Sequence, residues 1–158
     1  MSGWIDVLSP SLRKLHNDWL LFRGNFMMPD VQDFNTFANA PEVMAIEAAS
    51  ATVMLPMQGD PIFKHVGGLL LDLLPDCRSG MSFGAMRSPI SRAAVIGPFM
   101  RIARSRQPET RRLQRSSAIE VKHDCEILLL PFADRKLRVC VVHAVYDLSG
   151  INWKKAFL

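Results

Sequence analysis

The first third of the chain has the apolar spacing of helices. After a Ser-Pro-Ser helix start at 9–11, apolar residues recur every three or four positions and a glycine closes the pattern: Leu12, Leu15, Trp19, Phe22 and Gly24. This spacing predicts an amphipathic helix of about 13 residues, whose apolar stripe must be covered by its own domain or by a second copy. Two shorter helices are predicted after it, one from Pro29 and one over 41–49.

The middle of the chain predicts a hairpin followed by helices. Residues 51–57 and 62–66 have the composition of strands, and Gln-Gly-Asp-Pro between them is a strong turn signal. A short helix is predicted over 69–74. A longer one is predicted over 90–106, where Pro98 should kink or restart it.

The last third changes to the period of strands. Residues 110–122, 124–132 and 136–147 predict three long strands, with a turn at 133–135. Alternate residues of the last strand are apolar on both faces, so we expect both faces to be covered. The fold class predicted is α/β (α+β), a five-stranded antiparallel sheet with a helical crossover on one face and an N-terminal helical cap. The expected division is a cap over 1–49, a core over 50–149 and a tail over 150–158.

Composition narrows the class of protein. Hydrophobic residues make up 49% and charged residues 22% of 158 residues, which excludes a disordered chain and a coiled coil. Net charge is −2 over residues 1–100 (seven Lys and Arg, nine Asp and Glu) and +6 over 101–158 (twelve and six). Six arginines lie between Arg101 and Arg115. Nucleic-acid binding through this cluster is the alternative function, and a steep salt dependence of binding would reveal it.

The sequence also suggests a compartment. The three cysteines, Cys77, Cys125 and Cys140, are odd in number and widely spaced, which favours a reducing environment. No apolar stretch is long enough to span a membrane, and residues 1–10 lack the pattern of a secretory signal. We therefore expect a cytoplasmic protein.

Four stretches of the chain carry a resemblance to a known family. They are the helical opening (LHNDWLLFRG, then MP and DF, over 15–34), the strand IFKHVG at 62–67, the crossover over 70–83 and the strand EILLLPF at 126–132. In these stretches, and over roughly residues 12–146, the chain resembles a PAS domain, specifically the stand-alone type found in alphaproteobacteria. The resemblance implies a sensory or regulatory module that binds small molecules or proteins and signals through dimer contacts. We expect no output domain after it, and therefore an unidentified signalling protein as partner.

No catalytic or cofactor pattern stands out. The chain lacks a Ser-His-Asp order, paired carboxylates and a phosphate-binding glycine loop, so we expect no enzyme activity. Haem is not expected because the long helix has no histidine, and flavin is not expected because only Cys77 matches the flavin-reactive motif. A zinc site from His123, Cys125, Cys140 and His143 is disfavoured because Cys140 and His143 lie on opposite faces of a strand.

Two candidate sites follow from these patterns. A pocket for a small apolar ligand is predicted between the sheet and the long helix, with these candidate lining residues: Phe63, Ile96, Met100, Val139, Val141 and His143. His143 is either a buried, hydrogen-bonded histidine or a polar contact in that pocket. A homodimer is predicted on the stripe of the first helix, through Leu12, Leu15, Trp19 and Phe22.

Overall fold

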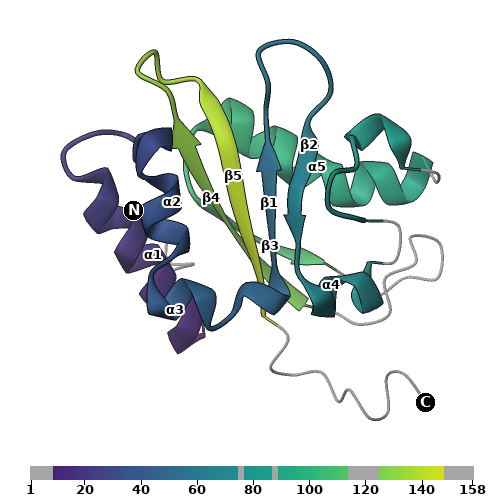
Figure 1. Cartoon of the computed structure of the whole chain (residues 1–158), viewed down its shortest axis with the longest axis horizontal. Coiled ribbons are helices and arrows are strands. Elements are labelled where there is room, and N and C mark those ends of the chain that lie inside the picture. The colour runs from purple at the N-terminus through teal and green to yellow at the C-terminus, as the bar shows by residue number, and fades with distance from the viewer. Residues whose placement is uncertain (1–8, 75–76, 87–88, 114–124, 148–158) are drawn as a thin grey trace.

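The computed structural model describes residues 9–74, 77–86, 89–113 and 125–147. Within them, one five-stranded antiparallel sheet lies between two groups of helices (Figure 1). The protein is therefore an α+β fold, as its sequence pattern predicts.

Residues 9–49 form the N-terminal cap. It contains three helices and two 3-10 turns: α1 (Pro10–Arg23), η2 (Val31–Asp33), α2 (Phe34–Ala38), α3 (Pro41–Met44) and η3 (Glu47–Ala49). Helix α1 begins at Pro10 because the Ser9 hydroxyl accepts a hydrogen bond from the Leu12 amide, which satisfies one exposed helix donor. It ends at Gly24, whose φ of 58° lies in the left-handed region that glycine adopts without strain.

The sheet has its last strand in the centre. Its strands are β1 (Ser50–Met54), β2 (Ile62–Val66), β3 (Glu109–Leu113), β4 (Cys125–Ala133) and β5 (Val139–Asp147), in the order β2-β1-β5-β4-β3. Strand β2 lies at the predicted residues. The third strand, predicted over 110–122, is described as far as Leu113, and the rest of that prediction lies outside the described residues.

A helical crossover connects the hairpin β1–β2 to β3. It contains α4 (Gly68–Leu73), η4 (Phe83–Ala85) and α5 (Pro89–Ser105). Gly67, which precedes α4, packs so closely on η3 that a Cβ atom would collide with the Ala48 and Glu47 carbonyl oxygens. Helix α5 continues through Pro98, where a restart was one of the expectations.

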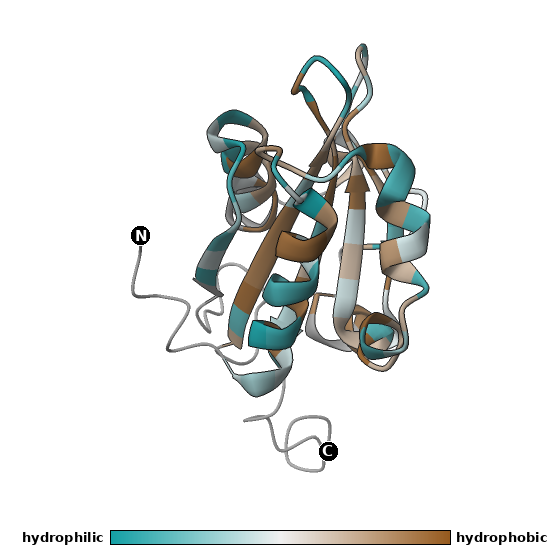
Figure 2. Ribbon diagram, turned by 90° about the vertical axis from the view of Figure 1, so that its left-hand side faces the viewer, coloured by the Kyte–Doolittle hydropathy of each residue, from teal (hydrophilic) through white to brown (hydrophobic). Residues whose placement is uncertain are grey.

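Helices cover both faces of the central strands. Residues Val141–Tyr146 of β5 are buried without interruption, which matches a strand that is apolar on both faces. One face packs on α5 through Phe63 and Phe99, and the other packs on the cap through Phe34 and Phe37. Figure 2 shows the hydrophobic strands enclosed between helices on either side.

The cap also covers an open edge of β4. In the described residues, β3 pairs with β4 from Cys125 to Leu129, and no described strand pairs with the far end of β4 on that side. There, the Trp19 indole Nε1 donates a hydrogen bond to the Pro131 carbonyl at 2.8 Å. The Ala133 amide donates to the Pro29 carbonyl at 3.0 Å. These two bonds anchor the cap to the backbone that β3 leaves unpaired.

Candidate functional site

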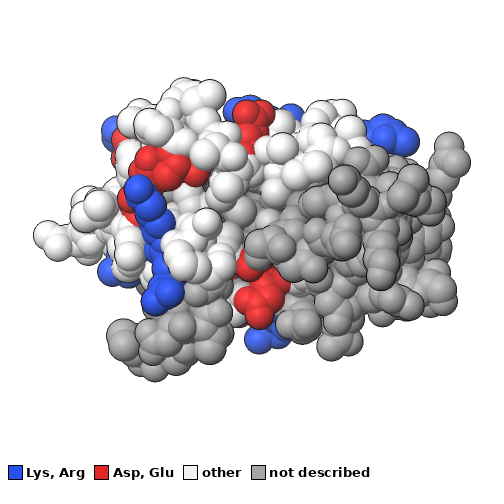
Figure 3. Space-filling model, turned by 90° about the horizontal axis from the view of Figure 1, so that it is seen from below, with Lys and Arg blue, Asp and Glu red and all other residues white. Residues whose placement is uncertain are grey.

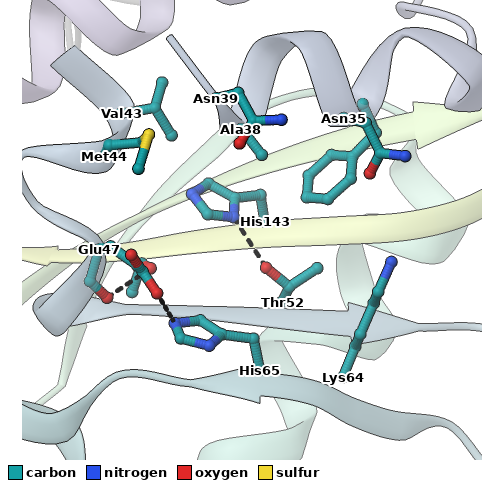
Figure 4. Close-up of a pocket in the computed structure, with 12 residues that line it drawn as sticks. Asn35, Ala38, Asn39, Val43, Met44, Glu47, Thr52, Lys64, His65 and His143 are labelled. Atoms are coloured by element: carbon teal, nitrogen blue, oxygen red, sulfur yellow. Dashed lines mark hydrogen bonds and ion pairs between the residues drawn. The ribbon is translucent and has the colours of Figure 1, made fainter. Parts of the chain in front are cut away.

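A pocket of about 270 Å³ lies between the cap and the sheet. We call it the cap pocket. Helices α2 and α3 form one wall, and β1, β2 and β5 form the other (Figure 4). Its apolar lining includes Phe34, Ala38 and Val43, and its polar lining includes Thr52, His65 and His143. A few polar groups within an apolar wall are typical of small-molecule sites.

His143 is one of the buried polar residues that line the cap pocket. Its Nδ1 lies 3.0 Å from the Thr52 Oγ1, and the two share a hydrogen bond. Its ring lies 5.8 Å from the Phe34 ring and 5.9 Å from the Phe37 ring, centroid to centroid. Its Nε2 is buried and has no hydrogen-bond partner among the described residues. Figure 4 shows the free nitrogen turned away from Thr52, towards the α3 side of the pocket.

Burial keeps the His143 ring neutral at physiological pH. Loss of solvation is the main cause and the electrostatic effect of nearby His65 the second, and together they lower the pKa of His143 to about 4. The neutral ring has one nitrogen that donates and one that accepts. It therefore offers either a hydrogen-bond donor or an acceptor to the pocket, but no charge.

A β-bulge brings two consecutive residues of β2 to the pocket. In a regular strand Lys64 and His65 would point to opposite faces. The pairing of β1 with β2 shifts by one residue, since Thr52 lies opposite His65 and Val53 lies opposite Phe63. Lys64 is left without a partner position, and both Lys64 and His65 line the cap pocket.

The polar groups at the mouth of the pocket are partly paired with one another. His65 Nε2 lies 3.5 Å from Glu47 Oε1, and both side chains are partly exposed. The Ser50 hydroxyl donates to the Glu47 carbonyl at 2.8 Å. Lys64 Nζ lies 5.9 Å from the centre of the Phe34 ring, a cation–π contact. Figure 4 shows Glu47, His65 and Lys64 along the lower side of the pocket, below His143 in this view.

The six candidate pocket residues do not line one pocket in the described part of the structure. They are divided between three places. Phe63 packs against Phe83 and Phe99 on the α5 face, where Ile96 also packs against the core. Met100 and Val139 line a separate surface pocket near the hairpin tips. Val141 and His143 share the opposite face, and only His143 lines the cap pocket. Alternation placed Val141 and His143 on one face, but the register shift beside Val139 separates that residue from them, and alternation could not indicate which helices would cover each face.

The four residues proposed for a dimer pack inside their own chain. Leu12, Leu15 and Trp19 are buried and Phe22 is half-buried, with its ring 5.8 Å from that of Phe37. Of the two coverings that the stripe allowed, the structure shows the intramolecular one. The homodimer stays a prediction, but this stripe is not an exposed surface for it.

The arginine cluster does not form one uncompensated basic field in its described part. Arg101 Nε lies 3.1 Å from Glu109 Oε1, and Arg111 Nη2 lies 3.9 Å from Glu109 Oε2. Arg104 is exposed, and the side chains of Arg112 and Arg115 are not among those described. Figure 3 shows basic and acidic groups interspersed on the described part of the lower face. Nucleic-acid binding stays an untested alternative.

The structure places the cysteines apart from the pocket. Cys77 and Cys125 are buried, Cys140 is half-buried, and no disulfide joins them in the described residues. His123, one of the four residues of the disfavoured zinc site, lies outside those residues. In the part of the chain that is described, no three His, Cys, Asp or Glu side chains gather as metal ligands.

Sequence reasoning missed most of the pocket's polar lining. Thr52, Lys64, His65 and Glu47 were not candidates, although Ser50 and Thr52 alternate with apolar residues along β1. That alternation was a usable signal for a polar strip on one sheet face. The contribution of Lys64 depends on the bulge, which local patterns do not reveal.

Fold and site together define an α+β domain with a helical cap and a ligand-sized pocket beneath it. Compared with known proteins, the chain matches no protein-family model, and no curated protein matches it significantly. Across the described residues, none of the helices has the length and apolar character required to cross a membrane.

Proposed function

We propose that this protein is a sensory or regulatory module of the PAS type, which binds a small ligand in the cap pocket and signals by contact with another protein. The observation that carries the proposal is the buried His143, with Thr52 on one ring nitrogen and an open pocket at the other. A buried polar atom without a partner costs about 1–3 kcal/mol, and a ligand can remove that cost. The proposal contains no catalytic step.

The packing of the cap offers a route from the pocket to the surface. Helix α2 contributes Phe34 and Ala38 to the pocket, and its Phe37 contacts Phe22 of α1. The far end of α1 and the turn after it expose Leu21 at 79% and Phe26 at 75%. A ligand that moves α2 would therefore shift α1, next to apolar side chains suited to a protein contact.

Pocket binding is tested by filling the pocket. Ala38 is half-buried in the wall, whereas Thr36 is exposed on the same short helix and does not line the pocket. Native mass spectrometry of wild type, Ala38→Phe and Thr36→Phe, each exposed to extract of the native cell, should detect a bound small molecule in wild type and Thr36→Phe only. Wild-type protein that binds nothing, or an Ala38→Phe variant that binds as well as wild type, would contradict the proposal.

Signalling is tested by hydrogen exchange. Ligand should change the protection of α1 backbone amides as well as those of α2, because Phe22 and Phe37 connect the two helices. Changes confined to the pocket strands would remove the proposed route. Light scattering tests the predicted homodimer separately, and a clean 17.8 kDa monomer at high micromolar concentration would contradict it.

A further inference from the structure

The polar groups around the cap pocket are not equally satisfied. Glu47 pairs with His65, and Ser50 donates to the Glu47 carbonyl. Lys64 and His143 Nε2 are different, because neither has an acidic or hydrogen-bonding partner among the described residues. A ligand gains most by serving these two groups.

Lys64 places a positive charge at the cap pocket. Its ammonium lies over the Phe34 ring, 5.9 Å from the ring centre, and no described carboxylate lies within ion-pair distance. The β2 bulge at Lys64 is what directs this side chain to the pocket. Bulges often redirect side chains next to binding sites. The unpaired cation favours an anionic ligand over a neutral one.

His143 provides the directional contact. The Thr52 hydroxyl can rotate to donate to Nδ1, and the neutral ring then carries its proton on Nε2. An Nε2–H group that faces the pocket donates to a ligand oxygen. Because His143 Nε2 is buried, a ligand that leaves it without a hydrogen bond binds at a cost in free energy. The pocket therefore selects ligands that place an acceptor at this nitrogen.

The remaining wall sets the shape of the ligand. Phe34, Ala38 and Val43 give an apolar surface, and a cavity of about 270 Å³ exceeds the roughly 150 Å³ that holds benzene. The Phe34 ring is a shared neighbour, since its centre lies 5.9 Å from Lys64 Nζ and 5.8 Å from the His143 ring. One small molecule resting on Phe34 can reach both groups.

We propose that the cap pocket binds a small organic carboxylate with an apolar body. Lys64 neutralises its charge, and His143 Nε2–H donates a hydrogen bond to one of its oxygens. This inference rests on the proposed function, because it assigns a chemical class to the ligand of the same pocket.

Three probes with the same body separate charge from shape: phenylacetate, phenylacetamide and 2-phenylethylamine. Titration calorimetry should show that the acid binds at least about tenfold more tightly than the amide, and that the amine does not bind. Lys64→Gln should reduce acid affinity to that of the amide and leave the amide unchanged. Lys136→Gln, at an exposed lysine of the β4–β5 turn, is the matched control and should change neither.

Nuclear magnetic resonance of the histidine side chain gives a readout that does not require a variant. Phenylacetate should shift the Nε2 resonance of His143, and shifts confined to α5 residues would overturn the inference. Equal affinity for acid and amide, or no loss in Lys64→Gln, would overturn the carboxylate assignment while pocket binding stands. If none of the probes binds folded protein at millimolar concentration, the ligand class is wrong. The proposed function is tested separately by native mass spectrometry: it fails if wild type binds nothing there, or if Ala38→Phe binds as well as wild type.

Discussion

The two faces of the sheet differ in how they are filled. On the α5 face, Phe63, Phe83 and Phe99 form a cluster with ring centroids 5.0–6.0 Å apart. On the cap face, aromatic packing by Phe34, Phe37 and Phe132 gives way to the pocket around His143. The first face is an apolar aromatic core, whereas the second buries a histidine whose Nε2 has no hydrogen-bond partner among the described residues. Under the proposed function, this contrast assigns stability and ligand binding to opposite sides of one sheet.

The largest expected effect is on the α5 face. Phe99→Ala removes a ring that is 1% exposed and contacts two other rings, so it should lower the free energy of unfolding by about 3–5 kcal/mol. Urea unfolding measures this loss. Met100→Ala, on the next residue of the same helix and 37% exposed, is the control and should cost less than about 1 kcal/mol. Equal costs for the two variants would show that this face is not the closely packed one.

A second effect comes from pH and belongs to the cap face. An unfolded histidine has a pKa near 6.5, while that of buried His143 is about 4. The unfolded chain therefore binds a proton first as pH falls, and stability is lost from about pH 6.5 down to about pH 4. The loss from this group reaches about 3 kcal/mol. Unfolding measured across this range should show it in wild type.

The His143→Gln variant isolates that contribution from those of other groups. Asp18 acts in the opposite direction: burial, and then its hydrogen bond with Glu42, raise the pKa of Asp18 to about 6, so its share of stability falls as pH rises from about 4 to 6. Asp18 is present in both wild type and His143→Gln, so its contribution cancels when their unfolding free energies are subtracted. A difference between wild type and His143→Gln that does not vary with pH would show that His143 is not buried as described.

A smaller effect on stability is expected from the hydrogen bond that joins the cap to the open edge of β4. Trp19→Phe keeps a ring of similar character but removes the donor to the Pro131 carbonyl. The buried carbonyl is then unpaired, and we expect a loss of about 1–3 kcal/mol in unfolding free energy. Thermal unfolding measures it. A variant as stable as wild type would mean that the cap depends on apolar contacts alone.

The smallest effect is expected at the pocket mouth. Glu47→Gln breaks the ion pair between Glu47 and His65. The His65 side chain is 34% exposed and the Glu47 side chain is 56% exposed. Exposed pairs of this kind contribute about 0–1 kcal/mol, so stability should barely change. Urea unfolding checks this, and a loss comparable with that of Phe99→Ala would end the distinction between a stabilising face and a binding face.

Local signals predicted the elements well, and their assembly less well. Ser9 and Gly24 mark α1 by their capping chemistry, and the turn before Ile62 marks the hairpin. The covering of each β5 face depends on contacts between residues distant in sequence, so alternation could not assign His143 to the cap side. The pocket depends further on the register shift at Lys64, which arises only when β1 and β2 pair.

The open edge of β4 gives the cap a further role, in solubility. With the cap in place, Trp19 and Pro29 form hydrogen bonds with backbone groups of β4 that could otherwise pair with a strand of another molecule. The exposed edge would belong to a strand that contains the run Ile127-Leu-Leu-Leu130, and such edges are templates for intermolecular pairing and aggregation. Any signal that lifts the cap fully therefore carries an aggregation hazard. The fold consequently favours small displacements of the cap over its release.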